Sequence, residues 1–512
     1  MRKIEKLRDD VKPRFNEAME PLSLLELIDT LQRLGVGCYF ENEIKRALDT
    51  ILPIKKNFVL LEEDLYATAL HFRLLRQYGY EVSQDTFKSF KDEKDGAFKA
   101  CISEDIKGML SLYEASYYAV EGEDILDEAQ EFTNRHLKDL KGNIAPHLIK
   151  QVSHALELPL HWTLPRIEAR WFIDFYKMKE DMDPLLLEFA VLDFNMLQAT
   201  YQQELKVLSR WWKSLGLAKT LRFTRDRLVE SFLWITGLFF EPQFGYCRKQ
   251  ITKVTLFLTM IDDIYDVYGS LDELKLFTDI VERWDINTMK DLPDYMKILF
   301  LALYNTTNVM AYDILKEKGW DIIPYLKKVL ADLCKAHLVE AKWYNIGYRP
   351  SLEEYMNNAW ISVGGNVVQV HAYFLMGIKI TNEALECLMG YPNLVRWPNF
   401  VLRYADDLAT SKDELERGDV PKSIQCYMHE SGNSEEIARE HIKHLLRDTL
   451  KKMNKDRVSS SPFPQPFISV AVNVARTAQF MYQYGDGFGV PDRETKERVL
   501  SLLIEPISLL ED

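Results

Sequence analysis

The sequence has little of what extracellular, nucleic-acid-binding or membrane-spanning proteins usually contain. Its six cysteines, at positions 38, 101, 247, 334, 387 and 426, include no CxxC pair, which predicts reduced thiols in an intracellular compartment. Basic residues number 64 against 78 acidic ones, and the net charge of −14 argues against nucleic acid or an anionic membrane as a partner. No apolar run approaches the ~18 residues that a membrane span needs.

Signals of β-structure are also nearly absent. The sequence lacks sustained alternation of polar and apolar residues and the tight turns of β-hairpins. Apolar residues instead recur at three- and four-residue spacing, which predicts helices over Leu22–Leu34, Ile106–Ala119, Ile125–Leu137 and Pro184–Trp212. The predicted fold class is therefore all-α.

The length of 512 residues predicts two domains. Gly216 interrupts the helical periodicity shortly after Trp212, which places the predicted junction in this region. We expect an N-terminal helical domain over residues 1–213 and a C-terminal domain over residues 214–512. The acidic and basic motifs that carry chemistry lie in the second domain.

Three aspartates interrupt an apolar stretch in the second domain. Asp262 and Asp266 are four residues apart, so they lie on one face of a helix, whereas Asp263 points about 100° away and is expected to orient a basic partner. Buried carboxylates are costly unless they are paired or bind a metal. Because hard divalent cations prefer oxygen ligands, Asp262 and Asp266 are predicted metal ligands. The alternative is a solvated helix end.

A second row of oxygen-bearing side chains lies far downstream. Asp406, Thr410 and Glu414 occupy positions i, i+4 and i+8, which form a nearly straight row along one helix face. Two carboxylates with a hydroxyl between them suit one further Mg²⁺ and leave positions for water and substrate phosphates. A charged surface helix is the alternative for this segment alone, but the first acidic motif favours a metal site.

Basic residues flank both acidic motifs. Arg225 and Arg227 precede the first motif, and Arg403 and Lys422 stand on either side of the second. An arginine fork matches two phosphate oxygens, and lysine offers a point charge. Each base alone would suit a surface ion pair. Together with the acids, they predict a pyrophosphorylated substrate that bridges metal ions and bases.

These motifs resemble those of the plant class I terpene synthases, in the order and approximate spacing of that family. The segments that carry the resemblance are RDR at 225–227, DDIYD at 262–266, DDLATSKDE at 406–414, SRWW at 209–212, RLVESFLW at 227–234 and GDVPKS at 418–423. The resemblance covers essentially the whole chain. Residues 302–308, ALYNTTN, are similar to the angiosperm monoterpene branch rather than the sesquiterpene branch.

The resemblance implies an N-terminal α-barrel relic domain without its own chemistry and a C-terminal catalytic helical bundle. The implied reaction is the ionisation of geranyl diphosphate with three Mg²⁺ ions, for which Mn²⁺ is a substitute. Loss of diphosphate leaves a carbocation, which is quenched to a linear or cyclic monoterpene or a monoterpene alcohol. The chain lacks a DxDD motif, so cyclisation initiated by protonation is not indicated.

The resemblance also implies roles for individual residues. Asp262 and Asp266 would ligate metal from one wall of the site, and Asp406, Thr410 and Glu414 from the other. The catalytic residues would be Asp262, Asp266, Arg225 and Trp234. The residues in contact with the substrate would be Arg225, Arg227, Asp262, Asp266, Arg403, Asp406 and Lys422.

A carbocation requires a dry and weakly nucleophilic cavity, for which aromatic side chains are suited. Trp234 lies seven residues after the second arginine, hence on a similar helix face, and resembles the cavity tryptophan of the family. Tyr482 and Phe488 flank a loop that is similar to the family's closing loop. Gly364 and its neighbour Gly365 predict a bend in a further wall. We expect Trp234 and the region of Asn305 to decide which product forms.

The first ten residues contain acids and helix formers, unlike a signal or transit peptide. Members of the branch usually begin with a plastid transit peptide, followed by a tandem-arginine motif and a tryptophan, and the sequence contains neither. We expect either a shortened chain or a member that lacks these features. The resemblance implies a plastid location, with the cytosol as the alternative, and a monomer or homodimer.

Three alternative functions stay open at this point. A sesquiterpene synthase that acts on farnesyl diphosphate would carry the same motifs. A trans-prenyltransferase also holds diphosphates with Mg²⁺ on helical aspartates, but it usually has a second DDxxD where this chain has Thr410 and Glu414. A catalytically inactive scaffold is the third, and the intact metal and arginine positions argue against it.

Overall fold

The computed structural model describes residues 2–18, 20–52, 63–140, 144–416, 421–490 and 493–508, with the backbone alone for residues 412–416. Throughout these residues the regular structure is helical, and an isolated β-bridge joins Lys91 to Phe98. The predicted all-α class is confirmed. Among the described residues, the six cysteines form no disulfides.

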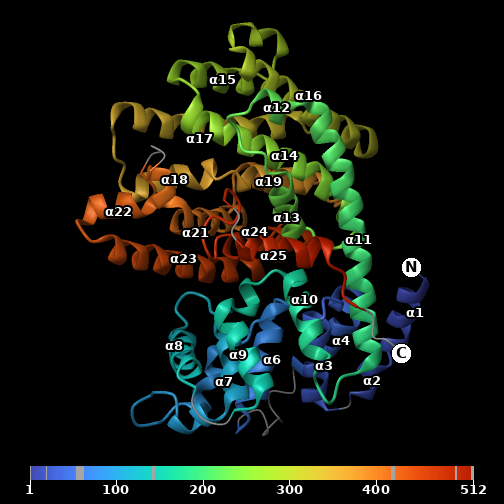
Figure 1. Ribbon diagram of the computed structural model, residues 1–512. Coiled ribbons are helices and arrows are strands. Elements are labelled where there is room, and N and C mark those ends of the chain that lie inside the picture. Colours follow the sequence, from blue (N-terminus) through green and yellow to red (C-terminus); the bar gives the residue numbers. More distant parts are fainter. Residues whose placement is uncertain are drawn as a thin grey trace. The chain divides into compact units, whose positions relative to one another are not determined.

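The chain divides into two compact units, of which the first comprises Met1–Ala199 and Ser501–Asp512 (Figure 1). Its α-helices are α1 (Arg2–Val11), α2 (Arg14–Glu17), α3 (Pro21–Arg33), α4 (Glu41–Ile51), α6 (Leu65–Gln77), α7 (Ile106–Ser116), α8 (Asp124–Lys138), α9 (Pro146–Glu157), α10 (Pro165–Tyr176) and the first half of α11 (Pro184–Leu215). Short 3₁₀ turns lie at η1 (Gly37–Phe40), η3 (Gln84–Phe90), η4 (Ala100–Glu104) and η5 (Leu160–Trp162).

Aspartate caps begin the central helices of the first unit. The carboxylate of Asp64 accepts a hydrogen bond from the Ala67 amide at 3.0 Å before α6, and that of Asp105 accepts one from the Gly108 amide at 2.8 Å before α7. Such side chains satisfy amide groups that the first helical turn leaves unpaired. Helix α7 packs between α6 and α8, where apolar residues are buried.

The second unit, Thr200–Leu500, contains the predicted motifs. Its α-helices are the end of α11, α12 (Leu217–Thr220), α13 (Leu228–Leu238), α14 (Gly245–Asp263), α15 (Leu271–Arg283), α16 (Asp294–Lys318), α17 (Ile323–Ile346), α18 (Leu352–Ser362), α19 (Gly365–Leu375), α20 (Asn382–Met389), α21 (Asn393–Glu416), α22 (Ser423–Ser431), α23 (Glu435–Val458), α24 (Gln465–Met481) and α25 (Arg493–Val499). Shorter turns are η6 (Pro242–Phe244), η7 (Ile264–Tyr268) and η8 (Ile286–Asp291). The turn η9 (Leu500–Ile504) begins at the last residue of the second unit and continues in the first unit.

Within the described ranges, helices α13, α14, α17, α18, α19, α21 and α24 contribute side chains to the cavity of the second unit. Helix α13 packs against α14 and α24, α14 packs against α19, and α21 packs against both α19 and α24. Helix α17 closes the ring through its contacts with α19 and with η7. Apolar side chains from these helices form a core that holds the polar side chains of the cavity in place.

The four helices predicted from periodicity are all present, within a few residues at their ends, as α3, α7, α8 and α11. Helix α11 ends at Leu215 because Gly216 adopts a left-handed conformation with φ of 69°. The two compact units divide after Ala199, inside this continuous helix. The predicted boundary between residues 213 and 214 is the start of an independently folding domain, and it stays a prediction.

In the part of the chain that the structure describes, one helix is long and apolar enough to cross a membrane by length and composition. This is α16, in which 39% of the relevant window is buried within the protein. It packs against α14 and α17 of the second unit. A partly buried core helix of this kind is weak support for a membrane span.

Candidate active site

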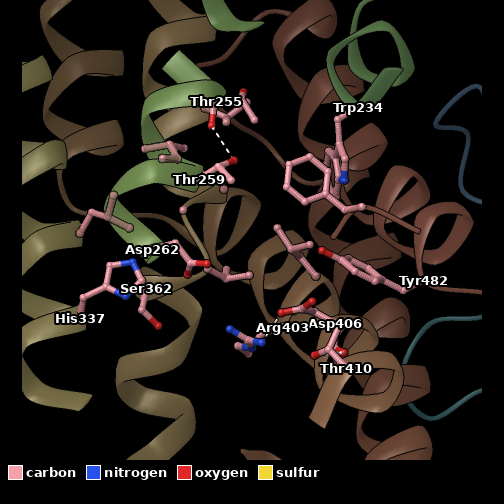
Figure 2. A pocket seen from close by; sticks show the side chains of 18 of the residues that line it. Trp234, Thr255, Thr259, Asp262, His337, Ser362, Arg403, Asp406, Thr410 and Tyr482 are labelled. Carbon is pink, nitrogen blue, oxygen red and sulfur yellow. Dashed lines mark hydrogen bonds and ion pairs between the residues drawn. The ribbon is translucent and has the colours of Figure 1, made fainter. Parts of the chain in front are cut away.

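A cavity with about 1070 Å³ of empty space, part of it open to solvent, lies inside the second unit (Figure 2). The predicted site residues that line it are Arg225, Trp234, Asp262, Asp266, Arg403, Asp406, Thr410 and Lys422. Figure 2 shows Asp262 on one side of the cavity and Asp406 with Thr410 on the other. The spatial association expected of the two acidic motifs is therefore present.

The first acidic wall lies where a regular helix changes its winding. Helix α14 ends at Asp263, and the π-helical turn η7 continues the chain and carries Asp266. Turns of this kind are rare and occur frequently at functional sites. Although the spacing is not that of an ideal α-helix, Asp262 and Asp266 both line the cavity, as predicted.

Arg225 joins the first acidic wall from the segment before α13. Its Nε and its backbone amide donate to the two carboxylate oxygens of Asp263, each at 2.7 Å, and its Nη2 donates to Asp262. The expectation that Asp263 orients a basic partner is confirmed. Asp226 accepts a hydrogen bond from Trp212 Nε1 at 2.9 Å, which anchors this arginine segment to α11.

The paired charges shift the pKa values of the three groups. Burial acts to raise the pKa of Asp262, but the positive charges of Arg225 and Lys422 and the hydrogen bond from Arg225 outweigh it and hold that pKa below its ordinary value. For Asp263 burial prevails, with the neighbouring acid adding to it, and its pKa is raised. Burial acts to lower the pKa of Arg225, yet the two carboxylates raise it overall, so this guanidinium is charged.

The second acidic wall is formed by α21. The Thr410 hydroxyl donates to the carbonyl oxygen of Asp406 at 2.9 Å, so its oxygen keeps lone pairs for a cation. Arg403 Nη2 contacts the carboxylate of Asp406. Glu414, the third predicted ligand of this row, has its side chain outside the described residues.

Asp407 supports this wall from behind, although sequence reasoning gave it no role. Its buried carboxylate contacts Arg403 Nη2 at 2.6 Å, and it accepts hydrogen bonds from the Tyr355 hydroxyl at 3.1 Å and the Ser423 amide at 3.0 Å. One carboxylate therefore fixes both a guanidinium and the start of α22, where Lys422 lines the cavity. The sequence signal for this supporting role was that Asp407 directly follows Asp406.

Apolar and aromatic side chains line much of the rest of the cavity, together with the polar residues Thr255, Thr259 and Asp486. Trp234 comes from α13, as predicted, and Tyr482 and Phe488 come from the segment after α24. Figure 2 shows Trp234 and Tyr482 on the same side of the cavity as Asp406. The remaining apolar lining residues are Ile235, Leu258, Leu333, Val363, Val368, Leu402 and Val474.

The predicted glycine wall is confirmed between α18 and α19. Gly364 has φ of 78°, a left-handed conformation that ends one helix and begins the next. Gly365 lies so close to α21 that an added Cβ would stand 1.9 Å from Asn399 Oδ1. Ser362, Val363 and both glycines line the cavity, so the wall depends on residues without bulky side chains at the break.

Sequence reasoning missed two polar residues that α17 contributes to the cavity. Glu340 is buried and accepts hydrogen bonds from Ser362 Oγ at 2.6 Å and Asn358 Nδ2 at 2.8 Å. His337 is also buried, and its Nδ1 lies 3.8 Å from Asp266 Oδ1. Burial lowers the pKa of His337. The only signal was their polar character on a largely apolar helix face.

Two sequence expectations do not match the placement of the cavity. Asn305 is exposed on α16 and is not among the residues that line the cavity, so it does not face the cavity as expected, and its influence on the product stays a prediction. The inward face of α16 is instead formed by Leu303, Thr307 and Met310. Arg227 does not line the cavity either, and its Nη2 donates to the carbonyl of Gly489. Its contact with substrate stays a prediction.

The groups of the first wall suit a divalent cation. Asp262, Asp266 and His337 each offer a ligand atom, and these atoms all lie within 4.8 Å of one another. Carboxylate oxygens are the ligands that Mg²⁺ and Mn²⁺ prefer. The cavity therefore combines donors for cations, bases for phosphate and an apolar space.

Comparison with known proteins gives matches over both parts of the chain. The terpene synthase N-terminal domain matches residues 1–156, and the metal binding domain of the terpene synthase family matches residues 213–452. (-)-alpha-terpineol synthase of Vitis vinifera is 58% identical over 99% of this chain and 86% of that protein. Chloroplastic myrcene synthase of Quercus ilex is 58% identical over 100% of this chain and 86% of its own length.

A solved structure with the same fold is isoprene synthase from grey poplar leaves, in complex with three Mg²⁺ ions and dimethylallyl-S-thiolodiphosphate. It has a TM-score of 0.95 and 50% sequence identity, and the match covers 99% of this chain and 97% of that chain. The resemblance found in the motifs is thereby confirmed over the whole length. The chain is an enzyme that belongs to the terpene synthase family, among relatives that are angiosperm monoterpene synthases.

Proposed function

We propose that this enzyme is a monoterpene synthase that ionises geranyl diphosphate, releases diphosphate and quenches the carbocation as a monoterpene or monoterpene alcohol. The observation that supports this most is one cavity with acids and bases at one part and an aromatic, apolar lining at another (Figure 2). A prenyl diphosphate has the same division into a charged head and an apolar tail.

Mg²⁺ is assigned as the cofactor, since the family has a metal binding domain and the related isoprene synthase holds three such ions. When bound, it supplies positive charge that neutralises the departing diphosphate. The residues proposed to hold it are Asp262 and Asp266 on one wall and Asp406 and Thr410 on the other. Glu414 completes the second wall by its place in the motif.

The basic residues are proposed to bind and orient the diphosphate. Arg225 and Arg403 each contact two aspartates, so both guanidiniums are held at the edge of the acidic walls. Lys422 lines the same region of the cavity. Because arginine forks bind phosphate oxygens in pairs, this arrangement fixes the head group while the tail lies among apolar residues.

The apolar part of the cavity is proposed to protect the carbocation from water. Trp234 is 9% exposed and lines the cavity. Tyr482 and Phe488 add two further aromatic rings. Aromatic faces stabilise a cation without trapping it as a covalent product, so they favour loss of a proton or ring closure.

The substrate separates this proposal from its alternatives. The names of the relatives favour a monoterpene product, whereas the isoprene synthase complex contains a five-carbon dimethylallyl analogue. The purified enzyme should be incubated with Mg²⁺ and with dimethylallyl, geranyl or farnesyl diphosphate in turn, with analysis of volatile products and released diphosphate. A fourth reaction combines geranyl diphosphate with isopentenyl diphosphate.

We expect efficient conversion of geranyl diphosphate to monoterpenes. Chain elongation in the fourth reaction would support a trans-prenyltransferase, and preference for farnesyl diphosphate a sesquiterpene synthase. Absence of diphosphate release from every substrate would support an inactive scaffold.

A plastid location is part of the proposal, because the myrcene synthase of Quercus ilex is named as chloroplastic. The cytosol is the alternative. A monomer or homodimer without nucleic acid or membrane partners stays a prediction. Fractionation of plant tissue and light scattering of the purified enzyme test these points.

A further inference from the structure

We propose that His337 supplies a nitrogen ligand to the divalent cation that Asp262 and Asp266 hold. This inference rests on the metal site proposed above and adds a ligand of a different chemical type to it. The DDIYD run contains oxygen ligands alone, whereas His337 comes from α17, more than 70 residues later in the sequence.

The distance between the imidazole and the acids suits a shared cation. His337 Nδ1 lies 3.8 Å from Asp266 Oδ1, and ligand atoms of all three residues lie within 4.8 Å of one another. Two ligands on one octahedral ion, with bonds of about 2.1 Å, stand about 3.0 Å apart when adjacent and about 4.2 Å apart when opposite. The distance of 3.8 Å between His337 Nδ1 and Asp266 Oδ1 falls between these values, so a small side-chain movement completes the site.

His337 differs from an ordinary core histidine. His371 in α19 is also buried, but its Nδ1 lies 2.8 Å from the carbonyl oxygen of Val367, in hydrogen-bonding contact. The Nδ1 of His337 has no hydrogen-bond partner among the described residues, although its side chain is only 4% exposed. A buried nitrogen that faces a carboxylate and lacks a hydrogen bond is explained by a cation between the two groups.

The ring of His337 is held in this orientation by its neighbour Tyr265. The two ring centroids lie 5.5 Å apart with the planes tilted by 34°. The Tyr265 hydroxyl is in turn fixed at 2.8 Å from Thr278 Oγ1 in α15. Because Tyr265 precedes Asp266 in η7, the same turn positions both the carboxylate and the imidazole.

A nitrogen ligand changes which cation the first wall favours. Imidazole raises the affinity for transition metals relative to Mg²⁺, whereas sites made of oxygen ligands alone suit Mg²⁺. The second wall offers oxygens from Asp406 and Thr410. The enzyme would therefore hold chemically different cations on its two walls, with Mn²⁺ preferred beside His337.

Pulsed electron paramagnetic resonance of Mn²⁺ tests this directly, because a coordinated imidazole adds a ¹⁴N coupling to the signal. The samples are the full-length enzyme with Mn²⁺ and inorganic diphosphate, in the wild type and in the variants His337→Phe and His337→Asn. His444→Asn is the matched control, since His444 is an exposed histidine whose Nε2 lies 3.3 Å from Asp448. Circular dichroism confirms that each variant is folded.

We expect ¹⁴N coupling in the wild type and in His444→Asn, and its loss in both His337 variants. The dissociation constant for Mn²⁺ should rise about tenfold or more in His337→Phe, on the scale seen when residues that support a metal site are lost. The value for Mg²⁺ should change less. Coupling that persists in His337→Phe would overturn the proposal.

Asp262→Asn separates the failure of this inference from the failure of the metal site itself. If Mn²⁺ binding in the wild type depends on Asp262 but shows no ¹⁴N coupling, only the role of His337 is wrong. If Mn²⁺ binds equally well to Asp262→Asn, the proposed site on the first wall is wrong as well.

Discussion

At the scale of single residues, the charged groups of the cavity are arranged in acid–base contacts. Arg225 contacts Asp262 and Asp263, and Arg403 contacts Asp406 and Asp407. Removing one partner from such a partly buried pair leaves a charge without compensation, which is more damaging than loss of a surface pair. Substitutions at these positions therefore need a fold control beside the activity assay.

Asp266→Asn should reduce the consumption of geranyl diphosphate at least about 100-fold, since even residues that only support a metal ligand contribute 10–100-fold. The change keeps the side-chain volume and removes the charge, so the fold should be unchanged by circular dichroism. Asp272→Asn is the matched control, because Asp272 is 91% exposed and pairs with Lys275 on the surface. Normal turnover in a folded Asp266→Asn enzyme would exclude the metal role.

Trp234→Leu should change the distribution of products while the consumption of geranyl diphosphate falls by less than about thirtyfold, since one cation–π contact contributes about 0.5–2 kcal/mol. The indole lines the cavity, so its loss alters the stabilisation of competing cations. Phe232→Leu is the control on the same helix, because Phe232 is buried and does not line the cavity. Gas chromatography compares the variants, and an unchanged profile in Trp234→Leu would assign the selection to other residues.

The sequence could predict those site residues that belong to a short, regular motif. Asp262 and Asp266 or Asp406 and Thr410 can be placed together because a helix repeats every 3.6 residues. His337 and Glu340 could not, because their proximity to the acids arises from packing of α17 against η7 and α18. Asn305 was expected to face the cavity, but it is exposed on α16. The polarity of a residue does not show which way it points until the buried face of its helix is known.

At the scale of elements, interruptions of helices shape the site more than the helices themselves. The π-turn η7 carries Asp266, and the left-handed Gly364 separates α18 from α19 beside the cavity. The sequence indicated the second interruption through its paired glycines. It did not indicate the first, because residues 264–268 contain neither glycine nor proline and read as a continuing α-helix.

Element packing in the first unit creates a pH-sensitive group on α7. Burial raises the pKa of Glu114 to about 7, against the opposing effects of Arg73 and Arg33 and of the Leu160 amide, which donates to it at 2.9 Å. The folded form therefore binds a proton more tightly than the unfolded form. The stabilisation is fully present below the unfolded pKa of about 4.5 and is lost as the pH rises towards 7.

Glu114→Gln should remove this dependence, so the stability of the variant relative to the wild type should rise between pH 5 and pH 8 by at most about 3 kcal/mol. Urea unfolding at the two pH values measures the difference. The exposed Glu104 provides the control Glu104→Gln, for which the relative stability should not depend on pH. Parallel pH profiles for the wild type and Glu114→Gln would contradict the prediction.

At the scale of the whole molecule, the chemistry lies in the second unit, whose cavity contains the acids, the bases and the aromatic residues. Helical periodicity sufficed to predict an all-α chain because apolar positions recur every three or four residues. The division after Ala199 could not be predicted, since α11 continues through it without a change in periodicity. Periodicity shows where a helix breaks, but it does not show a change in what a continuous helix packs against.

Because the cavity contains ligands from several helices of the second unit, metal binding should stabilise the folded enzyme as well as activate it. A chelator should abolish the consumption of geranyl diphosphate, and Mg²⁺ or Mn²⁺ should restore it.

In the absence of substrate, Mg²⁺ with inorganic diphosphate should raise the unfolding temperature, because a ligand at 100 times its dissociation constant stabilises the folded state by about 2.7 kcal/mol. Differential scanning calorimetry measures this shift, which should be much smaller in Asp266→Asn and unchanged in Asp272→Asn. Ionisation of geranyl diphosphate by the metal-free enzyme, or an equal thermal shift in Asp266→Asn, would show that the first acidic wall does not hold the cation.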